Sequence, residues 1–417
     1  MKGNLVIHNA HIFTPTGLEA AKGAKMSDIL EIRNGAVVIT DGSISYVGAD
    51  LSDEELGTAG DGWARLDAEG RAVLPGFVDS HTHAVFGGYR PDEFSWRLKG
   101  DTYMSIMERG GGIQSTVNAT REASADELEK KARIFMERMA AMGVTTVEMK
   151  SGYGLNLETE RKMLDVIDRL REDEKAPVEV VATFMGAHAV PKEYAGRTAE
   201  YTDLVISEML PAFRDKAEFC DIFTEKNVFE IEDSRRLMQA AKDLGYKLKF
   251  HADEIVTLGG AELAAEMGAV SADHLLHVSD EGVRQMAEKG VVATLLPLTA
   301  FALKEPFAPA RKFIEAGAAV ALATDLNPGS CFSGSVPLSI ALACIYMNMT
   351  VEETLTALTL NAAAALDRAD RIGSLEVGKE GNVVMLDFDT ITALPYYVGM
   401  NCVKKVWRHG VQIAENI

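Results

Sequence analysis

Cysteine is scarce in this sequence, and its spacing excludes two common uses. The four cysteines, Cys220, Cys331, Cys344 and Cys402, lie far apart among 417 residues and form no C-x-x-C pair. A disulfide scaffold and a zinc ribbon are therefore not indicated, and a reducing compartment fits the pattern. We expect a cytoplasmic protein.

Basic residues are few relative to acidic ones. Lys and Arg number 42 against 62 Asp and Glu, which gives a formal net charge of −20. A field of that sign repels phosphate backbones and anionic lipids. We therefore expect neither nucleic acid nor a membrane as a partner.

Long apolar runs are also missing. The longest, residues 290–303, contains Pro297 and stops at Lys304, short of the roughly 20 residues that a spanning helix needs. Polar residues interrupt the N-terminal segment MKGNLVIHNAHIF, so we expect no secretory signal.

What is present is the composition of a globular protein with a large core, 47% hydrophobic and 25% charged. The first 70 residues alternate like strands, and Asn34-Gly35 and Asp41-Gly42 predict two hairpin turns. Residues 381–388 and 402–414 also resemble strands, with His409-Gly410 as a turn. Because neither flank can bury a core alone, we expect them to meet as one small β unit.

Between these flanks, apolar strand candidates alternate with helical stretches. In the stretch after Ser124, for instance, Leu128, Ala132, Phe135 and Met139 recur at helical spacing, which indicates core packing. The strand candidates are residues 72–83, 144–152, 178–188, 220–225, 247–254, 271–277, 291–297 and 319–327. Eight strands with crossover helices predict an α/β fold, a (β/α)8 TIM barrel at residues 73–365. Residues 1–72 and 366–417 would form a composite β-sandwich-like domain.

Histidines gather where these strands end. Of nine in the chain, the six at predicted strand ends are His81, His83, His188, His251, His274 and His277. His81 and His83 form an H-x-H pair, and residues i and i+2 of a strand point to the same face, so both imidazoles can reach one ion. Asp325 follows the eighth strand. Since barrel sites are built at the carboxyl ends of the strands, this pattern indicates a metal site.

These residues carry a resemblance to a known family. The segments VLPGFVDSHTHAVFGGYR and GSLEVGKEGNVVMLD, together with His251, His274 and Asp325, resemble the amidohydrolase superfamily of metal-dependent hydrolases. More closely, GYRPDEF, SGYGLN, MGAHAVP, FHADE, ADHLLH and TDLNPGS resemble its imidazolonepropionase family. That family opens the ring of 4-imidazolone-5-propanoate to N-formimidoyl-L-glutamate in histidine degradation, and the similarity runs nearly the full length.

The resemblance implies one metal ion per subunit, held by His81, His83, His251 and Asp325. Two-metal members of the superfamily use a carboxylated lysine at the end of strand four, where residues 220–225 offer none. Lys150, on strand two, is better explained as an ion-pair partner or positioning charge. Three imidazoles and a carboxylate suit Zn²⁺ or iron (Fe³⁺) and do not decide between them. The resemblance also implies a homodimer.

The chemistry implied is attack of a metal-bound hydroxide on the cyclic amide carbonyl. Asp325 would accept the proton of the water and return it to the leaving nitrogen. His274 would position the hydroxide or support the oxyanion. Glu254, three residues after His251, would hydrogen-bond the ring and shuttle a proton.

A small-molecule substrate that carries a propionate needs a cation, and Arg90, just beyond the H-x-H strand, has the planar fork suited to a carboxylate. By resemblance, the other substrate-binding residues are Tyr153, His188, Glu254, Asn327, Gly329 and Ser330. Tyr103 is a weaker candidate, and we expect His277 to be structural.

Other functions fit the sequence less well. Another mononuclear amidohydrolase or aminohydrolase acting on a cyclic amide or amidine ring, such as a purine, is the main one, although a neutral nucleobase would not require Arg90. A catalytically dead scaffold would have lost ligands, which this chain retains. A dinucleotide loop at Gly152-Tyr153-Gly154 lacks its third glycine. Cys331 as a nucleophile lacks an accompanying His/Asn motif.

Overall fold

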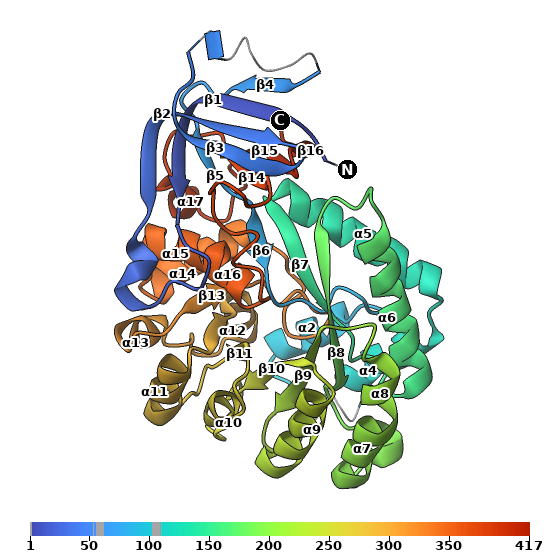
Figure 1. Ribbon diagram of the computed structural model, residues 1–417. Helices are drawn as coiled ribbons and strands as arrows, with labels where there is room; N and C mark the ends of the chain where they lie inside the picture. The colour runs from blue at the N-terminus through green and yellow to red at the C-terminus, as the bar shows by residue number, and fades with distance from the viewer. Residues whose placement is uncertain (1, 53, 56–61, 102–108, 110) are drawn as a thin grey trace.

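The computed structural model describes residues 2–52, 54–55, 62–101, 109 and 111–417. Two sheets organise the chain (Figure 1), one built from both termini and one from the middle of the sequence. Among the described residues, no helix is both long and apolar enough to cross a membrane.

The terminal sheet has eight strands, in the order β16-β15-β14-β5-β1-β2-β3, with β4 also paired to β1. Its strands are β1 (Leu5–Thr14), β2 (Leu30–Thr40), β3 (Ser43–Ala49), β4 (Ala64–Asp67), β5 (Ala72–Pro75), β14 (Val383–Leu386), β15 (Val403–Arg408) and β16 (Val411–Glu415). Antiparallel pairing of β14 with β5 joins the C-terminal strands to the N-terminal ones. The two flanks of the chain therefore form one mixed sheet, as the sequence predicts.

One of the predicted hairpin turns is wrong. Asn34-Gly35 lies inside β2, which pairs with β1 on both sides of it, and the register shifts between the Ala10 and Ile12 pairings. Asn34 has a φ of 48°, so the dipeptide forms an irregularity within a strand rather than a turn. The turns at Asp41-Gly42 and His409-Gly410 are confirmed, between β2 and β3 and between β15 and β16.

The second sheet has eight parallel strands in sequential order from β6 to β13. They are β6 (Phe77–Asp79), β7 (Val144–Lys150), β8 (Glu179–Ala187), β9 (Phe219–Thr224), β10 (Lys247–Ala252), β11 (Ser271–His274), β12 (Val292–Leu295) and β13 (Val320–Leu322). A bridge between Thr82 and Leu326 joins the segments that follow β6 and β13, and the His83 amide donates to the Leu326 carbonyl at 2.8 Å. The predicted barrel is thus confirmed, and its last and first strands meet at the carboxyl end.

The first predicted strand, residues 72–83, is divided between the two sheets. β5 belongs to the terminal sheet and β6 to the barrel, with Gly76 between them. A Cβ at Gly76 would lie 2.3 Å from Oγ1 of Thr145. Only glycine fits where the chain passes from one sheet to the other.

Helices alternate with the barrel strands and surround them (Figure 1). The α-helices are α2 (Pro91–Leu98), α4 (Ile113–Glu122), α5 (Ala125–Ala141), α6 (Leu157–Glu172), α7 (Thr198–Leu204), α8 (Leu210–Phe213), α9 (Ile231–Asp243), α10 (Gly260–Met267), α11 (Asp280–Lys289), α12 (Pro297–Leu303), α13 (Ala310–Glu315), α14 (Val336–Tyr346), α15 (Val351–Leu358), α16 (Leu360–Ala364) and α17 (Ala393–Tyr396). Short η segments are η1 (Gly23–Ser27), η2 (Lys192–Tyr194) and η3 (Val205–Met209).

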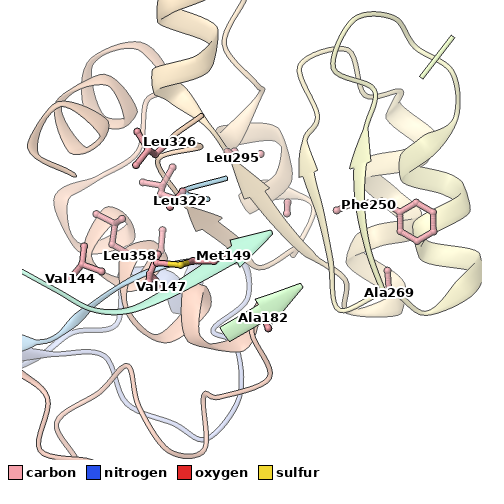
Figure 2. Packing of buried hydrophobic residues seen from close by; sticks show 14 of the residues in the cluster. Val144, Val147, Met149, Ala182, Phe250, Ala269, Leu295, Leu322, Leu326 and Leu358 are labelled. Atoms are coloured by element: carbon pink, nitrogen blue, oxygen red, sulfur yellow. The ribbon is translucent and has the colours of Figure 1, made fainter. Parts of the chain in front are cut away.

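Helix α5 shows how the sequence sets these elements. Ser124 and Glu127 cap its first turn reciprocally, which satisfies amides that the helix leaves unpaired. The predicted stripe of Leu128, Ala132, Phe135 and Met139 is buried. Figure 2 shows the apolar packing around the strands, with Val147 and Met149 of β7 near Leu358 of α15. This packing fixes the strand ends at which the polar residues gather.

Candidate metal and active site

Five predicted site residues meet at the carboxyl end of the barrel. His81 and His83 follow β6, His251 lies in β10, His274 ends β11 and Asp325 follows β13. Each is at most 3% exposed. The ring centroids of His81 and His251 are 4.5 Å apart, and those of His251 and His274 are 5.0 Å apart. Strands distant in sequence thus place one cluster of donors in a buried position.

The donor atoms have the spacing of a metal site. Nε2 of His251 lies 3.3 Å from Nε2 of His83, and Oδ1 of Asp325 lies 3.5 Å from Nε2 of His81 and 3.7 Å from Nε2 of His83. Bonds of about 2.0–2.1 Å around a tetrahedral ion would separate ligand atoms by about 3.3 Å. Nε2 of His81 is buried without a hydrogen-bond partner among the described residues. The donor set and its spacing therefore fit one ion.

Two overlapping triads can hold that ion. Within each, the ligand atoms lie within 4.8 Å of one another: one is His81, His83 and Asp325, and the other is His81, His251 and His274. His81 is common to both, and His251 approaches His83 directly. The structure thus brings together the four predicted ligands, with His274 as an adjacent fifth donor.

Carboxylates behind two of the imidazoles fix their orientation. Nδ1 of His81 donates to Asp273 at 2.6 Å, and Nδ1 of His251 donates to Asp221 at 3.1 Å. With the Nδ1 proton held there, each ring presents its other nitrogen to the centre of the cluster. Burial, followed by the charge of Lys150, lowers the pKa of His81. Neutral imidazole is the form that binds metals.

The same carboxylates belong to a buried ion-pair network inside the barrel. Nζ of Lys150 lies 2.7 Å from Asp221 and 2.9 Å from Glu148, and Nζ of Lys249 lies 3.7 Å from Asp273. Burial alone would lower the pKa of Lys150, but Asp221 and Glu148 raise it above its usual range. The lysine therefore stays charged, and its predicted ion-pair role is confirmed.

Asp325 is held by a residue that the sequence did not suggest. Thr299, in α12, donates its hydroxyl to Oδ2 of Asp325 at 2.6 Å, which leaves Oδ1 facing the histidines. Asp325 has a φ of 51°, a strained conformation of the kind found at functional sites. Burial raises the pKa of Asp325 to about 6.

Glu254 lies beside His274, 3.6 Å from Oε2 to Nε2. Burial, reinforced by the charges of Asp325 and Glu225, raises its pKa to about 8. Its loop is held by two carboxylates: Asp253 accepts the amides of Leu258, Gly259, Gly260 and Ala261, and Glu225 accepts that of Ile255. The Glu254 carboxyl group is therefore a proton-carrying group in a fixed position.

Arg90 and the loop after β13 form the cationic side of the site. A Cβ at Gly329 would lie 1.8 Å from Nη2 of Arg90, so any larger residue there would displace the guanidinium. The Arg90 side chain is 10% exposed and 3.5 Å from Glu93. Its Nε is buried without a hydrogen-bond partner among the described residues. The guanidinium thus retains donors for an anion.

Asn327 and Ser330 shape this loop from within. Oδ1 of Asn327 accepts the amides of Gly329 and Ser330, both at 2.8 Å, and its Nδ2 donates to the Asp325 carbonyl and to Oγ of Ser330. These side-chain atoms hold the loop against Arg90. The predicted contact of Asn327 with substrate remains a prediction.

Tyr153 and His188 pack against His83 at the edge of the cluster. His188 stacks on His83 with centroids 4.8 Å apart, and Tyr153 lies 5.0 Å from His188. Burial lowers the pKa of His188 to about 3 and raises that of Tyr153 above its usual range. Both rings are therefore neutral at pH 7.

The structure also bears on the remaining residues that the sequence suggested for the site or for an alternative function. His277 meets this region through its backbone, whose amide donates to the Asp253 carbonyl at 2.9 Å. Burial raises the pKa of the Cys331 thiol, which disfavours a thiolate nucleophile. The amides of Gly152 and Gly154 donate to Glu160, so they do not form an open dinucleotide loop. Tyr103 lies outside the described residues.

Sequence reasoning missed the supporting residues Asp221, Asp273 and Thr299. The two aspartates are acidic residues inside buried strands, and that anomaly is the signal that could have revealed them. Thr299 lies in an apolar helix and carries no comparable signal.

Comparison with known proteins identifies the class. Residues 72–413 match the amidohydrolase family, so the chain belongs to that family and is a metal-dependent hydrolase. The imidazolonepropionase of Bacteroides thetaiotaomicron is 62% identical over 97% of both chains, and that of Clostridium tetani is 53% identical over 98% of both. Within the amidohydrolases, the chain is thus a member of the imidazolonepropionase family, as the motifs indicate.

More distant solved structures share the fold. A triazine hydrolase variant superposes with a TM-score of 0.76 at 18% identity, covering 99% of this chain and 95% of that one. The atrazine chlorohydrolase of Arthrobacter aurescens, complexed with zinc, superposes with a TM-score of 0.73 at 17% identity, with 99% and 95% coverage. At such identities the likeness describes the barrel and its accompanying sheet alone.

Proposed function

We propose that this enzyme hydrolyses 4-imidazolone-5-propanoate to N-formimidoyl-L-glutamate, a step in histidine degradation. The observation that carries the proposal is the 62% identity to an imidazolonepropionase over nearly the whole chain. The site supports it independently, because a cluster of metal donors lies beside a buried cation suited to a carboxylate.

One ion per subunit would be held by His81, His83, His251 and Asp325. When bound, such an ion supplies a Lewis acid that polarises a carbonyl and lowers the pKa of water. Convergence of the donor atoms at 3.3–3.7 Å supports this ligand set. The donors suit Zn²⁺ and Fe³⁺ equally, so either is proposed.

Hydrolysis adds water to the ring carbonyl carbon and breaks its bond to the ring nitrogen. Asp325 accepts a proton from the attacking water and later delivers one to the departing nitrogen. Thr299 holds the carboxylate in the required orientation. His274 lies next to His251 and Glu254, where it can stabilise charge that develops on the carbonyl oxygen.

Glu254, 3.6 Å from His274, would contact the ring of the substrate. Because its pKa is raised to about 8 by burial, it carries a proton at pH 7 and can donate it to a ring nitrogen. Glu254 then recovers a proton from solvent after the product leaves, because the proton of the attacking water passes to Asp325. Its anchored loop supports this role, since proton transfer requires fixed geometry.

Arg90 binds the propionate carboxylate, and its spare donors support this assignment. Tyr153 and His188 pack against the ring, while Asn327, Gly329 and Ser330 complete the pocket through the loop that faces Arg90. The propionate carboxylate, which the guanidinium fork of Arg90 would bind, distinguishes this substrate from a neutral nucleobase.

Three further features are proposed. The enzyme is a homodimer, as expected for its family. It is located in the cytoplasm, as expected for four unpaired cysteines. Residues 1–72 and 366–417 form a composite domain and residues 73–365 the barrel domain. The pairing of β5 with β14 supports a composite of both termini, and it adds residues 73–75 to the terminal sheet. Light scattering of the purified protein tests the dimer.

The activity is tested by incubating the metal-loaded protein with 4-imidazolone-5-propanoate and, separately, with adenosine. We expect loss of the imidazolone ultraviolet band and appearance of N-formimidoyl-L-glutamate, with no change in adenosine. Deamination of adenosine without attack on the imidazolone would overturn the proposal.

A further inference from the structure

A buried carboxylate lies behind the substrate-facing loop and has no part in the mechanism above. Glu160 is in the first turn of α6 and is fully buried. Its Oε1 accepts the amides of Gly154 at 2.8 Å and Leu155 at 2.9 Å, and its Oε2 accepts the amide of Gly152 at 3.0 Å. The carboxylate thus binds the backbone on both sides of Tyr153.

Glu160 relies on these amides because no ion pair to it is found among the described residues. The Ser151 hydroxyl also bonds to it, yet burial still raises its pKa. A buried carboxylate is costly unless hydrogen bonds satisfy it. The Glu160 carboxylate therefore needs the loop amides as hydrogen-bond donors, and the loop needs the carboxylate as their acceptor.

The loop that Glu160 holds is under conformational constraint. Gly152 has a φ of 105° and Leu155 a φ of 53°. A Cβ at Gly152 would lie 2.7 Å from the Met185 carbonyl oxygen, and one at Gly154 would lie 2.5 Å from the Glu160 amide. Such a backbone persists only where surrounding contacts impose it, and the Glu160 carboxylate makes three of those contacts.

The loop in turn orients two rings of the site. The Gly152 carbonyl oxygen lies 3.1 Å from Nδ1 of His188, and a Cβ at Gly152 would lie 3.0 Å from the His188 Cβ. Tyr153, between the anchored amides, packs on His188 and faces His83 at 5.8 Å. Any shift of this backbone therefore moves both rings.

We infer that Glu160 is a positioning residue, which sets the orientation of Tyr153 and His188 and thereby the affinity of the site for its substrate. The inference rests on the proposed function for the identity of that substrate. Asp221, Asp273 and Thr299 bond directly to metal ligands, whereas Glu160 bonds to the backbone on both sides of Tyr153. Its loss should thus weaken substrate binding and leave the chemical step and the metal content intact.

The test compares Glu160→Gln with Glu158→Gln, the same change at an exposed carboxylate in the same helical turn. An amide at position 160 has one acceptor oxygen and presents an NH₂ group to backbone donors. We expect KM to rise on the order of 10-fold or more, with kcat within about 3-fold and metal content unchanged. Hydrogen exchange should quicken in residues 151–156. Glu158→Gln should match wild type in all four measurements.

Should Glu160→Gln fail to fold, Glu160→Asp keeps the charge but withdraws it by one methylene, and we expect the same rise in KM. An unchanged KM in either folded variant overturns the inference. So does a loss of kcat and metal with KM preserved, which would indicate a purely structural role. Absence of turnover in wild type would instead refute the proposed function, so the two failures are distinguishable.

Discussion

Replacing Arg90 with methionine tests how the site selects a carboxylate. The side chain is 10% exposed, its Nε is unpaired among the described residues, and the Glu93 carboxylate is 3.5 Å away. The guanidinium therefore has donors to give to a ligand. Methionine keeps much of the apolar stem and removes the charged fork.

The expected loss of kcat/KM follows from the removal of one charged hydrogen bond. A hydrogen bond to a charged group contributes about 1.5–3 kcal/mol, which corresponds to roughly 10- to 150-fold in kcat/KM. The assay compares 4-imidazolone-5-propanoate with its 5-propyl analogue, which lacks the carboxylate. Wild type should strongly prefer the former, and Arg90→Met should lose most of that preference while retaining its metal.

Arg97→Met is the matched control. Arg97 lies in α2, close to Arg90 in sequence, and donates to the Gly329 carbonyl at 3.1 Å, so it supports the same loop while its guanidinium is already bonded to the protein. We expect this variant to keep the preference for the carboxylate. Equal discrimination by wild type and Arg90→Met would refute the reasoning.

Two other predictions concern buried charges. Since burial raises the pKa of Glu254 to about 8, its proton is present below that pH, and kcat/KM should fall as pH rises through about 8. Glu254→Gln should remove this limb and lower kcat on the order of 10²–10⁴-fold with metal retained; near-normal activity would contradict the role. Lys150→Met removes the buried cation closest to Asp221 and Glu148 and should cost about 3–5 kcal/mol in chemical unfolding. Lys216→Met, at the partly exposed pairs with Asp165 and Asp168, should cost about 0–1 kcal/mol. Equal unfolding costs for the two variants would contradict the importance of burial.

Much of the fold could be predicted because barrel strands are continuous apolar runs separated by amphipathic helices. The one misplaced turn, Asn34-Gly35, has local chemistry typical of hairpins, but pairing with β1 on both sides holds it inside β2. That outcome depends on a partner strand, which local sequence does not reveal. The division of residues 72–83 between two sheets likewise depends on the contact of Gly76 with Thr145.

The metal cluster could be predicted because its members lie at strand ends, and parallel strands bring their ends together. The contacts that hold the metal ligands and the substrate-facing loop could not be predicted. Thr299 reaches Asp325 from a helix, and Glu160 reaches Gly152 across a loop. Such contacts depend on distances between elements, which no local pattern encodes.

The most direct test of the central claim is a metal titration of the metal-free protein, assayed by formation of N-formimidoyl-L-glutamate from 4-imidazolone-5-propanoate. One buried cluster of His81, His83, His251 and Asp325 predicts that turnover rises linearly to one equivalent of metal per chain and then stays constant. A rise that continues to two equivalents, or no product at any metal content, would contradict it.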